Sequence, residues 1–490
     1  MVFNSYIFIL LFLPTVIIGY YGLNHFKLYK LSKIFLIIMS LWFYSYTNIK
    51  YIAVLFLSII VNYCLCCILV DNKQIKLGGA TGKKSRKIIL IIGLVFNIGT
   101  LIYYKYFNFF VENINVIFST NFNYINLILP LGISFITFQH IAYLIDCYKG
   151  EEVRYNFSDF FLSVVFFPKI LSGPIVFHHE IIPQFLDTTK KNFNYECFAK
   201  GLVSFSFGMA KKVLLADNFG KIVTWGWDSL ETLDSTNAIL VMLAYTMQIY
   251  FDFSGYSDMA VGIGRMLRIE MINNFSSPYK ALTPAEFWKF WHISLTRFFT
   301  RYLYIPLGGN RKGKIRTYIN NMIVFLVSGF WHGANWTFIL WGLMHGVAIV
   351  INRIFKEKIK TIHPALLWIV TFSFINIAWI YFRAPSISEG TLLVKKILYC
   401  DFSTIDYNIV QCFDLPELEV FLGILGLSLS PYIVIACFAI TVCAVLYTKN
   451  TSERLDSFKA NISMMIIIPF LLIWSILSFS GVSTFLYVNF

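Results

Sequence analysis

The sequence predicts an all-α polytopic membrane protein of about eleven transmembrane helices, with re-entrant or short buried helices between them. Hydrophobic residues make up 58% of the 490 residues and charged residues only 13%. The mean hydropathy of +0.68 lies far above that of soluble globular domains. Apolar runs long enough to cross a bilayer recur from residues 4–21 through 462–480. Because no internal repeat or low-complexity tract interrupts them, residues 1–490 are predicted to form one membrane domain.

The first apolar run, at 6–20, is predicted to be a retained helix and not a signal peptide. No lysine or arginine precedes it, and no small-residue cleavage pattern follows it. Basic clusters follow the first helix, at 27–33, and the third helix, at 73–87. Since short cytoplasmic loops carry an excess of lysine and arginine, both clusters are predicted to be cytoplasmic and the N-terminus to lie outside.

The same positive-inside bias accounts for the net charge of +14, so no nucleic-acid partner is predicted. It places the basic loops at 311–316, 353–360 and 449–459 on the cytoplasmic side. A lipid-headgroup role for any one of these loops is the alternative to a plain topology signal.

The nine cysteines show no metal-ligand spacing, and no metal site is predicted. Cys400 and Cys412 lie in the polar segment 383–417, which the charge pattern places outside. Oxidising conditions there would allow a disulfide between them, and two free thiols are the alternative.

Two segments are too interrupted to be ordinary lipid-facing helices. Residues 129–140 carry Pro130, which predicts a kinked helix, and a polar row of Ser134, Thr137 and His140 near one helical face. Residues 167–174 contain two prolines and a glycine after an apolar run too short to span a bilayer, which predicts a re-entrant segment. Irregular backbone at membrane depth must be covered by protein or line a cavity.

A third segment brings carboxylates to the end of a spanning run. Gln248 and Asp252 share a helical face, and Arg265 lies two turns beyond Asp258. Asp258 is therefore either a partner of Arg265 in a structural ion pair or, with Asp252, a functional carboxylate.

Residues 284–303 mix aromatic and polar side chains, among them Trp288, Trp291, His292 and Arg297. The pattern predicts either an amphipathic helix at the membrane interface or a short buried helix near a polar cavity. His292 and Arg297 could bind phosphate or carboxyl oxygens, with interfacial snorkelling as the alternative for the arginine.

The most informative motif is Trp-His-Gly-Ala-Asn-Trp at 331–336. A helix from Arg316 to His332 would be ~24 Å long against a hydrocarbon core of ~30 Å, so His332 is predicted inside the membrane, nearer its outer leaflet. Trp331 and Trp336 would form flat apolar walls around it. A titratable ring at that depth indicates a functional site.

Two chemical roles remain open for His332. A neutral imidazole could accept a proton from a hydroxyl nucleophile. The same nitrogen could instead attack a thioester and form an acyl-imidazole. His345, on the returning helix, is interpreted as a packing residue, with a second pocket group as the alternative.

The motifs together resemble the membrane-bound O-acyltransferase (MBOAT) family, specifically its bacterial branch of alginate O-acetylation proteins and peptidoglycan O-acetyltransferases. The similarity is strongest over about 129–345 and extends to the last residues, 485–490. It rests on five blocks in the family's order: 129–150, 167–185, 250–264, 288–310 and 328–345.

The resemblance implies catalytic roles for His332, as the family's essential histidine, and for His292, as its second characteristic polar position. Other residues within the matching stretches become candidate substrate-binding residues: Asp252, Asp258, Trp288, Trp291, Arg297 and Asn335. Relatives often begin the basic stretch near Phe177 one residue earlier, which puts in doubt an acceptor contact by that side chain.

The resemblance also implies the fold and the reaction. A helical ridge, completed by C-terminal helices at 364–490, would surround a thin central cavity reached from both faces. An acetyl group would move from a cytoplasmic thioester donor, acetyl-coenzyme A, towards a hydroxyl of a cell-envelope glycan, with no bound cofactor. A separate extracytoplasmic acyltransferase of the SGNH type would be the partner.

Two alternatives stay open. One is D-alanyl transfer to teichoic acid, by a related branch of the same family. The other is a polysaccharide or lipid transporter, since broken helices and midplane polar groups also serve transport. A transporter should tolerate asparagine at position 332 far better than an acyltransferase would.

Overall fold

The computed structural model describes residues 1–46, 48–74, 80–151, 153–413, 416–458, 461–479 and 485–486. The chain is 76% helical, and its described part contains no strand, which confirms the all-α prediction. Six helical segments there are long and apolar enough to cross a membrane, namely Phe8–His25, Lys50–Asp71, Lys84–Phe118, Ser235–Met266, Trp336–Ile354 and Pro364–Arg383. The predicted count of about eleven is not confirmed, because several other apolar helices are shorter.

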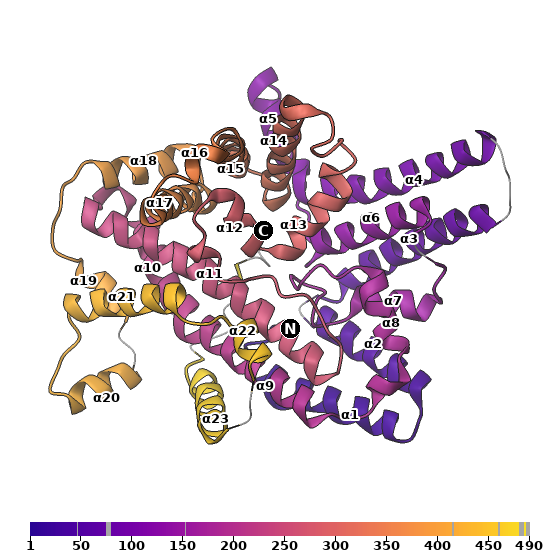
Figure 1. Ribbon diagram of the computed structural model, residues 1–490, viewed down its shortest axis with the longest axis horizontal. Coiled ribbons are helices and arrows are strands. Elements are labelled where there is room, and N and C mark those ends of the chain that lie inside the picture. Colours follow the sequence, from indigo (N-terminus) through magenta and orange to yellow (C-terminus); the bar gives the residue numbers. More distant parts are fainter. Residues whose placement is uncertain are drawn as a thin grey trace.

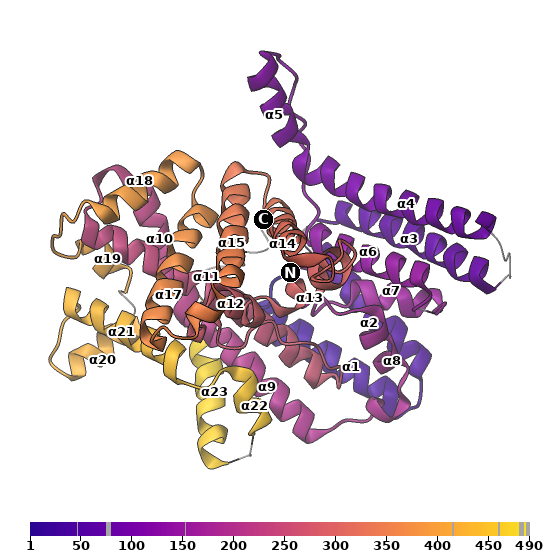
Figure 2. The same cartoon turned by 45° about the horizontal axis from the view of Figure 1, so that its top comes forward.

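The N-terminal third forms two antiparallel helix pairs and an extension. Figure 1 shows α3 and α4 packed against α6 (Ile133–Lys149), and Figure 2 shows α5 rising beyond the end of α4. The helices are α1 (Leu13–His25), α2 (Tyr29–Ser45), α3 (Lys50–Gln74), α4 (Ala80–Leu101) and α5 (Phe107–Phe118). π-Helical turns precede α1 at Phe8–Phe12 and join α4 to α5 at Ile102–Tyr106.

The centre of the molecule is built on α11, a helix with 72% of its apolar span buried inside the protein. The central helices are α6 (Ile133–Lys149), α7 (Phe157–Val165), α8 (His178–Leu186), α9 (Tyr195–Ala210), α10 (Asp217–Asp228) and α11 (Ser235–Met266). A π-helical turn, Lys211–Ala216, joins α9 to α10. Glycines let α9 approach α11 closely: a Cβ atom on Gly208 would lie 2.6 Å from the carbonyl oxygen of Gly255.

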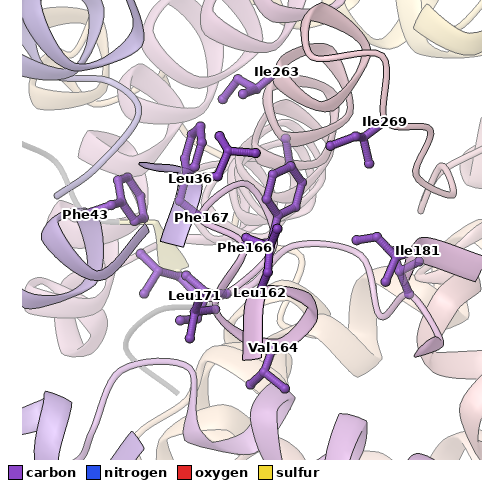
Figure 3. Close-up of a cluster of buried hydrophobic side chains, with 14 of the residues drawn as sticks. Leu36, Phe43, Leu162, Val164, Phe166, Phe167, Leu171, Ile181, Ile263 and Ile269 are labelled. Carbon is purple, nitrogen blue, oxygen red and sulfur yellow. The ribbon is translucent and has the colours of Figure 1, made fainter. Parts of the chain in front are cut away.

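The chain between α7 and α8 is irregular, and residues 166–177 are all buried. Figure 3 shows Phe166, Phe167 and Leu171 of this segment among side chains from α2 and α11, such as Leu36 and Ile263. The structure therefore confirms an interrupted segment covered by protein, as the prolines and glycine of 167–174 predict.

The C-terminal half begins with two short helices and a tight hairpin. These are α12 (Pro284–Phe290), α13 (Ile293–Phe299), α14 (Gly313–His332) and α15 (Trp336–Ile354). Eight helices follow: α16 (Lys356–Ile359), α17 (Pro364–Arg383), α18 (Ile387–Leu398), α19 (Tyr407–Gln411), α20 (Pro416–Ile424), α21 (Pro431–Tyr447), α22 (Thr451–Asp456) and α23 (Ile462–Leu477).

One local prediction is wrong. Pro130 kinks no helix, because α6 begins only after Gly132, whose φ of +71° turns the chain. A Cβ atom on Gly132 would lie 2.4 Å from the carbonyl oxygen of Ile170, so the turn also needs the missing side chain. Residues 284–303 form two short helices, because His292, at a φ of +46°, separates α12 from α13. Of the two alternatives predicted for them, this is nearer to the short buried helix.

Cys400 and Cys412 are free thiols and form no disulfide with each other, which is the second of the two alternatives predicted for them. The Cys412 thiol donates to the carbonyl oxygen of Asn408 at 3.2 Å, and the Cys400 thiol lies 3.6 Å from that of Leu398. Parts of other predictions lie outside the described residues: Lys76 in the first basic loops, Lys459 in the last one, and 487–490 of the closing stretch.

Candidate functional site

His332 is the last residue of α14 and is 2% exposed. Its ring centroid lies 4.9 Å from that of Trp331, 5.1 Å from that of Trp341 and 5.1 Å from that of Phe382. The predicted apolar walls are therefore present, but Trp336 is not one of them. Trp336 is 53% exposed and donates from Nε1 to Asn113 Oδ1 at 2.9 Å.

The α14–α15 hairpin fixes where the helix stops and His332 sits. A Cβ atom on Gly333 would lie 2.1 Å from the Phe338 ring, and one on Gly329 would lie 2.3 Å from the carbonyl oxygen of Phe338. Asn335 caps α15, accepting from the Thr337 amide at 3.0 Å, and its Nδ2 donates to the carbonyl of Pro385 at 2.8 Å. The described contacts of Asn335 thus shape the turn beside His332.

Lys105, from the π-helical turn after α4, holds the end of α14. Its Nζ donates to the carbonyl oxygen of Trp331 at 2.7 Å and to that of His332 at 3.0 Å. The Tyr106 hydroxyl donates to the carbonyl of Phe330 at 2.8 Å. The last carbonyls of a helix lack partners within it, and a cation there complements the helix dipole. The sequence analysis missed Lys105, although a lone lysine in an apolar spanning run was a usable signal.

A small recess of about 20 Å³ opens against His332. Lys105, Ser134 and Trp331 line it together with Pro130 and other residues of the segment before α6. A space of this size holds about one water molecule. Of the predicted polar row, Ser134 therefore lines the same recess as His332.

His292 lies at the break between α12 and α13, fully buried. The Ile293 and Ser294 amides donate to Asn274, which secures the left-handed backbone of His292. Its ring packs edge-on against Phe253, at 4.7 Å between centroids, and His292 lies close enough to His332 to interact with it electrostatically. A positive φ in a residue with a Cβ atom is strained, and such strain clusters at functional sites.

Trp288 is connected to His332 through two aromatic rings. Its Nε1 donates to His345 Nδ1 at 3.1 Å, and its ring centroid lies 5.6 Å from that of Trp341. Because Trp341 also contacts His332, these side chains form one continuous wall. His345 takes part in packing that wall, as its preferred interpretation predicted.

A cavity of about 750 Å³ lies between α12, α13, α14, α15 and α16. Its lining includes buried Trp288 and Ser328, the latter one helical turn before His332. It also includes four exposed basic residues, namely Lys289, Arg353, Lys356 and Lys360. The cavity therefore runs from a positively charged surface to the aromatic wall beside the histidine.

Trp291 and Arg297 lie in other surroundings. Trp291 is buried in a core of aromatic rings, 4.9 Å from Trp379 between centroids. Arg297 pairs with Glu180 and lies over the Phe177 ring, 5.0 Å from its centroid. The arginine thus has a carboxylate partner in place of the predicted alternative of interfacial snorkelling.

Asp252 and Asp258 each face a lysine of the π-helical turn after α9. Asp252 lies 2.7 Å from Lys212 Nζ and accepts from the Leu486 amide at 2.9 Å. Asp258 lies 2.6 Å from Lys211 Nζ, so the predicted pair with Arg265 is wrong. The reason is tertiary: packing of α9 and its turn along α11 brings Lys211 to Asp258. A substrate-binding role for either carboxylate stays a prediction.

Comparisons with known proteins agree with this geometry. Residues 153–388 match MBOAT, the membrane-bound O-acyltransferase family. The chain is 40% identical over 428 residues to the peptidoglycan O-acetyltransferase of Helicobacter pylori, an alignment that covers 81% of this chain and 80% of that protein. It is 34% identical over 449 residues to the probable alginate O-acetylase AlgI of Azotobacter vinelandii, covering 90% and 85%. Similarity to the teichoic acid D-alanyltransferase of Streptococcus thermophilus is 29% over 250 residues, covering 48% and 59%.

Proposed function

This chain belongs to the membrane-bound O-acyltransferase family and is an acyltransferase, and from that premise we propose that it transfers an acetyl group from cytoplasmic acetyl-coenzyme A across the bacterial cytoplasmic membrane for O-acetylation of a cell-envelope or exported polysaccharide. The observation that carries the proposal is the position of buried His332, which lines the small polar recess and lies one helical turn from Ser328 in the lining of the large basic cavity. Relatives named for peptidoglycan and alginate acetylation, at 40% and 34% identity, support acetyl as the group and a polysaccharide as the final acceptor.

The 750 Å³ cavity is the proposed donor route. Coenzyme A is a polyanion on a long thin arm, and the exposed cations Arg353, Lys356 and Lys360 would attract its phosphates. These cations belong to the loop predicted to be cytoplasmic. The arm would then lead the thioester past Trp288 and Ser328 towards His332.

His332 would act in one of two ways. As a general base it would take the proton of the acceptor hydroxyl while that oxygen attacks the thioester carbonyl and the thiol of coenzyme A leaves. As a nucleophile its ring nitrogen would attack the carbonyl, and the acyl-imidazole formed would pass its acetyl group to the acceptor. In either case Lys105 is a positioning residue, since it fixes the carbonyl groups that end α14. His292 is the proposed second catalytic residue.

The acceptor side is proposed to involve a separate extracytoplasmic protein of the SGNH type. A histidine that is 2% exposed is poorly placed to meet a polysaccharide chain directly. A relay would let a small acyl group leave the membrane and reach the glycan on another enzyme. An outward N-terminus belongs to the same topology proposal.

The test is the ester-linked acetate that mild base releases from envelope and secreted glycans. Cells carrying the wild-type gene, a deletion or His332→Ala would be compared, with membrane levels of the variant measured by immunoblot. Equal loss of acetate in the deletion and the variant is expected, and the glycan fraction that loses it identifies the acceptor. Unchanged acetate would refute the proposal.

D-Alanyl transfer is the second candidate, because the chain also resembles the teichoic acid D-alanyltransferase over 250 residues. Alanine measured in the same base hydrolysates separates the two. Loss of alanine with acetate intact would replace the acetyl proposal with this one.

A further inference from the structure

A second large cavity, of about 980 Å³, lies on another flank of the molecule. It is enclosed by the π-helical turn after α9, by α10 and α11, and by α21, α22 and α23; Figures 1 and 2 both show α22 and α23 beside α9. We propose that this cavity is a binding site for one anionic phospholipid, with an acyl chain in its apolar part and the headgroup on Lys449 and Arg454. The proposal is independent of the acyl-transfer function.

Most of the cavity wall is apolar and faces the membrane. Ile440 of α21, and Phe470, Ile473 and Leu477 of α23, line the cavity and are also exposed on the outside of the protein. Because α21 and α23 are apolar helices, these exposed side chains lie at hydrocarbon depth. An acyl chain from the bilayer can therefore enter between them without crossing a polar barrier.

The polar lining residues gather where the chain passes from α21 to α23. This end contains Lys449, Asn450, Thr451 and Arg454, which follow the last turn of α21 or belong to α22. A segment that joins two apolar helices sits at the membrane surface, the depth at which phospholipid headgroups lie. An acyl chain in the apolar part and a headgroup at the polar end would therefore give a bound lipid the orientation that it has in the bilayer.

The charges at this end favour an anion. Arg454 Nε donates to the carbonyl oxygen of Lys449 at 3.0 Å, and the guanidinium lies over the Phe207 ring, which keeps the two cations together. Within the described part of the chain neither Lys449 nor Arg454 forms an ion pair. The neighbouring carboxylate of Glu453 instead accepts from the Asn450 amide at 3.1 Å.

The third cation of the lining is already neutralised. Lys211 Nζ lies 2.6 Å from Asp258, and that carboxylate also accepts from the Thr451 hydroxyl. Lys449 and Arg454 are therefore the two lining cations without a carboxylate partner among the described residues. A phosphodiester headgroup with a net negative charge satisfies both, whereas a zwitterionic headgroup brings its own cation to the same place.

The experiment titrates the purified full-length chain with dioleoyl-phosphatidylglycerol or dioleoyl-phosphatidylcholine. Native mass spectrometry measures the binding of each lipid. Lys449→Gln combined with Arg454→Gln should weaken phosphatidylglycerol binding about 25-fold, about fivefold for each cation, and leave phosphatidylcholine binding unchanged. Ala444→Trp, at an exposed position of the cavity wall, should narrow the cavity and weaken binding of both lipids.

The matched control is Arg311→Gln combined with Lys314→Gln, which removes two exposed charges from another loop predicted to be cytoplasmic. It should bind both lipids as the wild type does, and size-exclusion chromatography checks the folding of every variant. Equal binding of the two lipids by the wild type would overturn the proposal. So would an equal loss in the control pair, or lipid binding that Ala444→Trp leaves unchanged.

Discussion

The ammonium group of Lys105 donates to the main-chain carbonyl of His332 at 3.0 Å, across 227 positions of sequence. A π-helical turn in the N-terminal half thereby fixes the end of the helix that carries the candidate catalytic histidine. The contact uses the main chain of His332, which leaves the imidazole ring facing the aromatic wall. Lys105 is consequently expected to matter for the position of the ring.

Lys105→Met should lower kcat by about 100-fold, because a displacement of about 1 Å at a reacting group costs that much. The KM for acetyl-coenzyme A should stay near the wild-type value, since Lys105 does not line the donor cavity. Steady-state kinetics of reconstituted protein measures both constants. Lys105→Arg, which keeps a cation, should recover part of kcat, and a rise in KM alone would contradict a positioning role.

His292→Ala and His292→Gly should both lose acetyl transfer but differ in stability. Residue 292 has a φ of +46°, which costs a side chain with a Cβ atom about 1 kcal/mol relative to glycine. The glycine variant should therefore unfold at a higher temperature than the alanine variant. Thermal unfolding in detergent measures the order, and full activity in either variant would exclude a catalytic His292.

Lys356→Glu should raise the KM for acetyl-coenzyme A about tenfold and leave kcat unchanged. The substitution places a negative charge in the exposed lining of the donor cavity, where two unit charges interact by about 1 kcal/mol or more. Lys314→Glu, an equal charge change outside that lining, is the control. If both variants raise KM equally, the effect comes from net charge and the cavity is not the donor route.

Asp252→Asn tests whether this carboxylate binds substrate or holds the fold. Asp252 is buried with Lys212, and removing one partner of such a pair costs about 3 kcal/mol or more. A lower unfolding temperature with an unchanged KM would assign it to the fold. Asp217→Asn, which affects the more exposed partner of the same lysine, should cost less stability. An increased KM at wild-type stability would instead support the predicted substrate-binding role of Asp252.

Asp234, the N-cap residue of α11, should make stability depend on pH. Burial raises the pKa of its carboxyl group, but hydrogen bonds from Ser403 and Asn237 outweigh burial, and the pKa is lowered overall. A lowered pKa in the folded protein means that Asp234 stabilises it above the unfolded value, about 4, and that this contribution is lost as the pH falls further. Asp234→Asn should therefore be less stable than the wild type at neutral pH and similar to it in acid. Chemical unfolding at the two pH values measures the difference, and a constant gap would contradict the assignment.

The sequence by itself determined the helical membrane architecture, the interrupted segment at 167–174 and the burial of His332. These properties follow from local sequence. The length of the apolar runs predicts the spanning helices, prolines and a glycine predict the interruption, and the number of residues between Arg316 and His332 places the imidazole inside the membrane. The same local information placed Trp331 beside His332, but it misplaced Trp336, whose indole donates to Asn113.

Only the tertiary structure decided which groups meet. Lys105 donates to the main-chain carbonyl of His332, and Asp258 pairs with Lys211 and not with Arg265. The helix is interrupted at His292, where Asn274 accepts a hydrogen bond from the next turn. The pairing of Lys211 with Asp258 depends on how closely α9 approaches α11, which their glycine contacts set. Hydropathy is a sum over neighbouring residues, whereas the partner of a charge is chosen by distances of a few ångströms that arise only once the helices have packed.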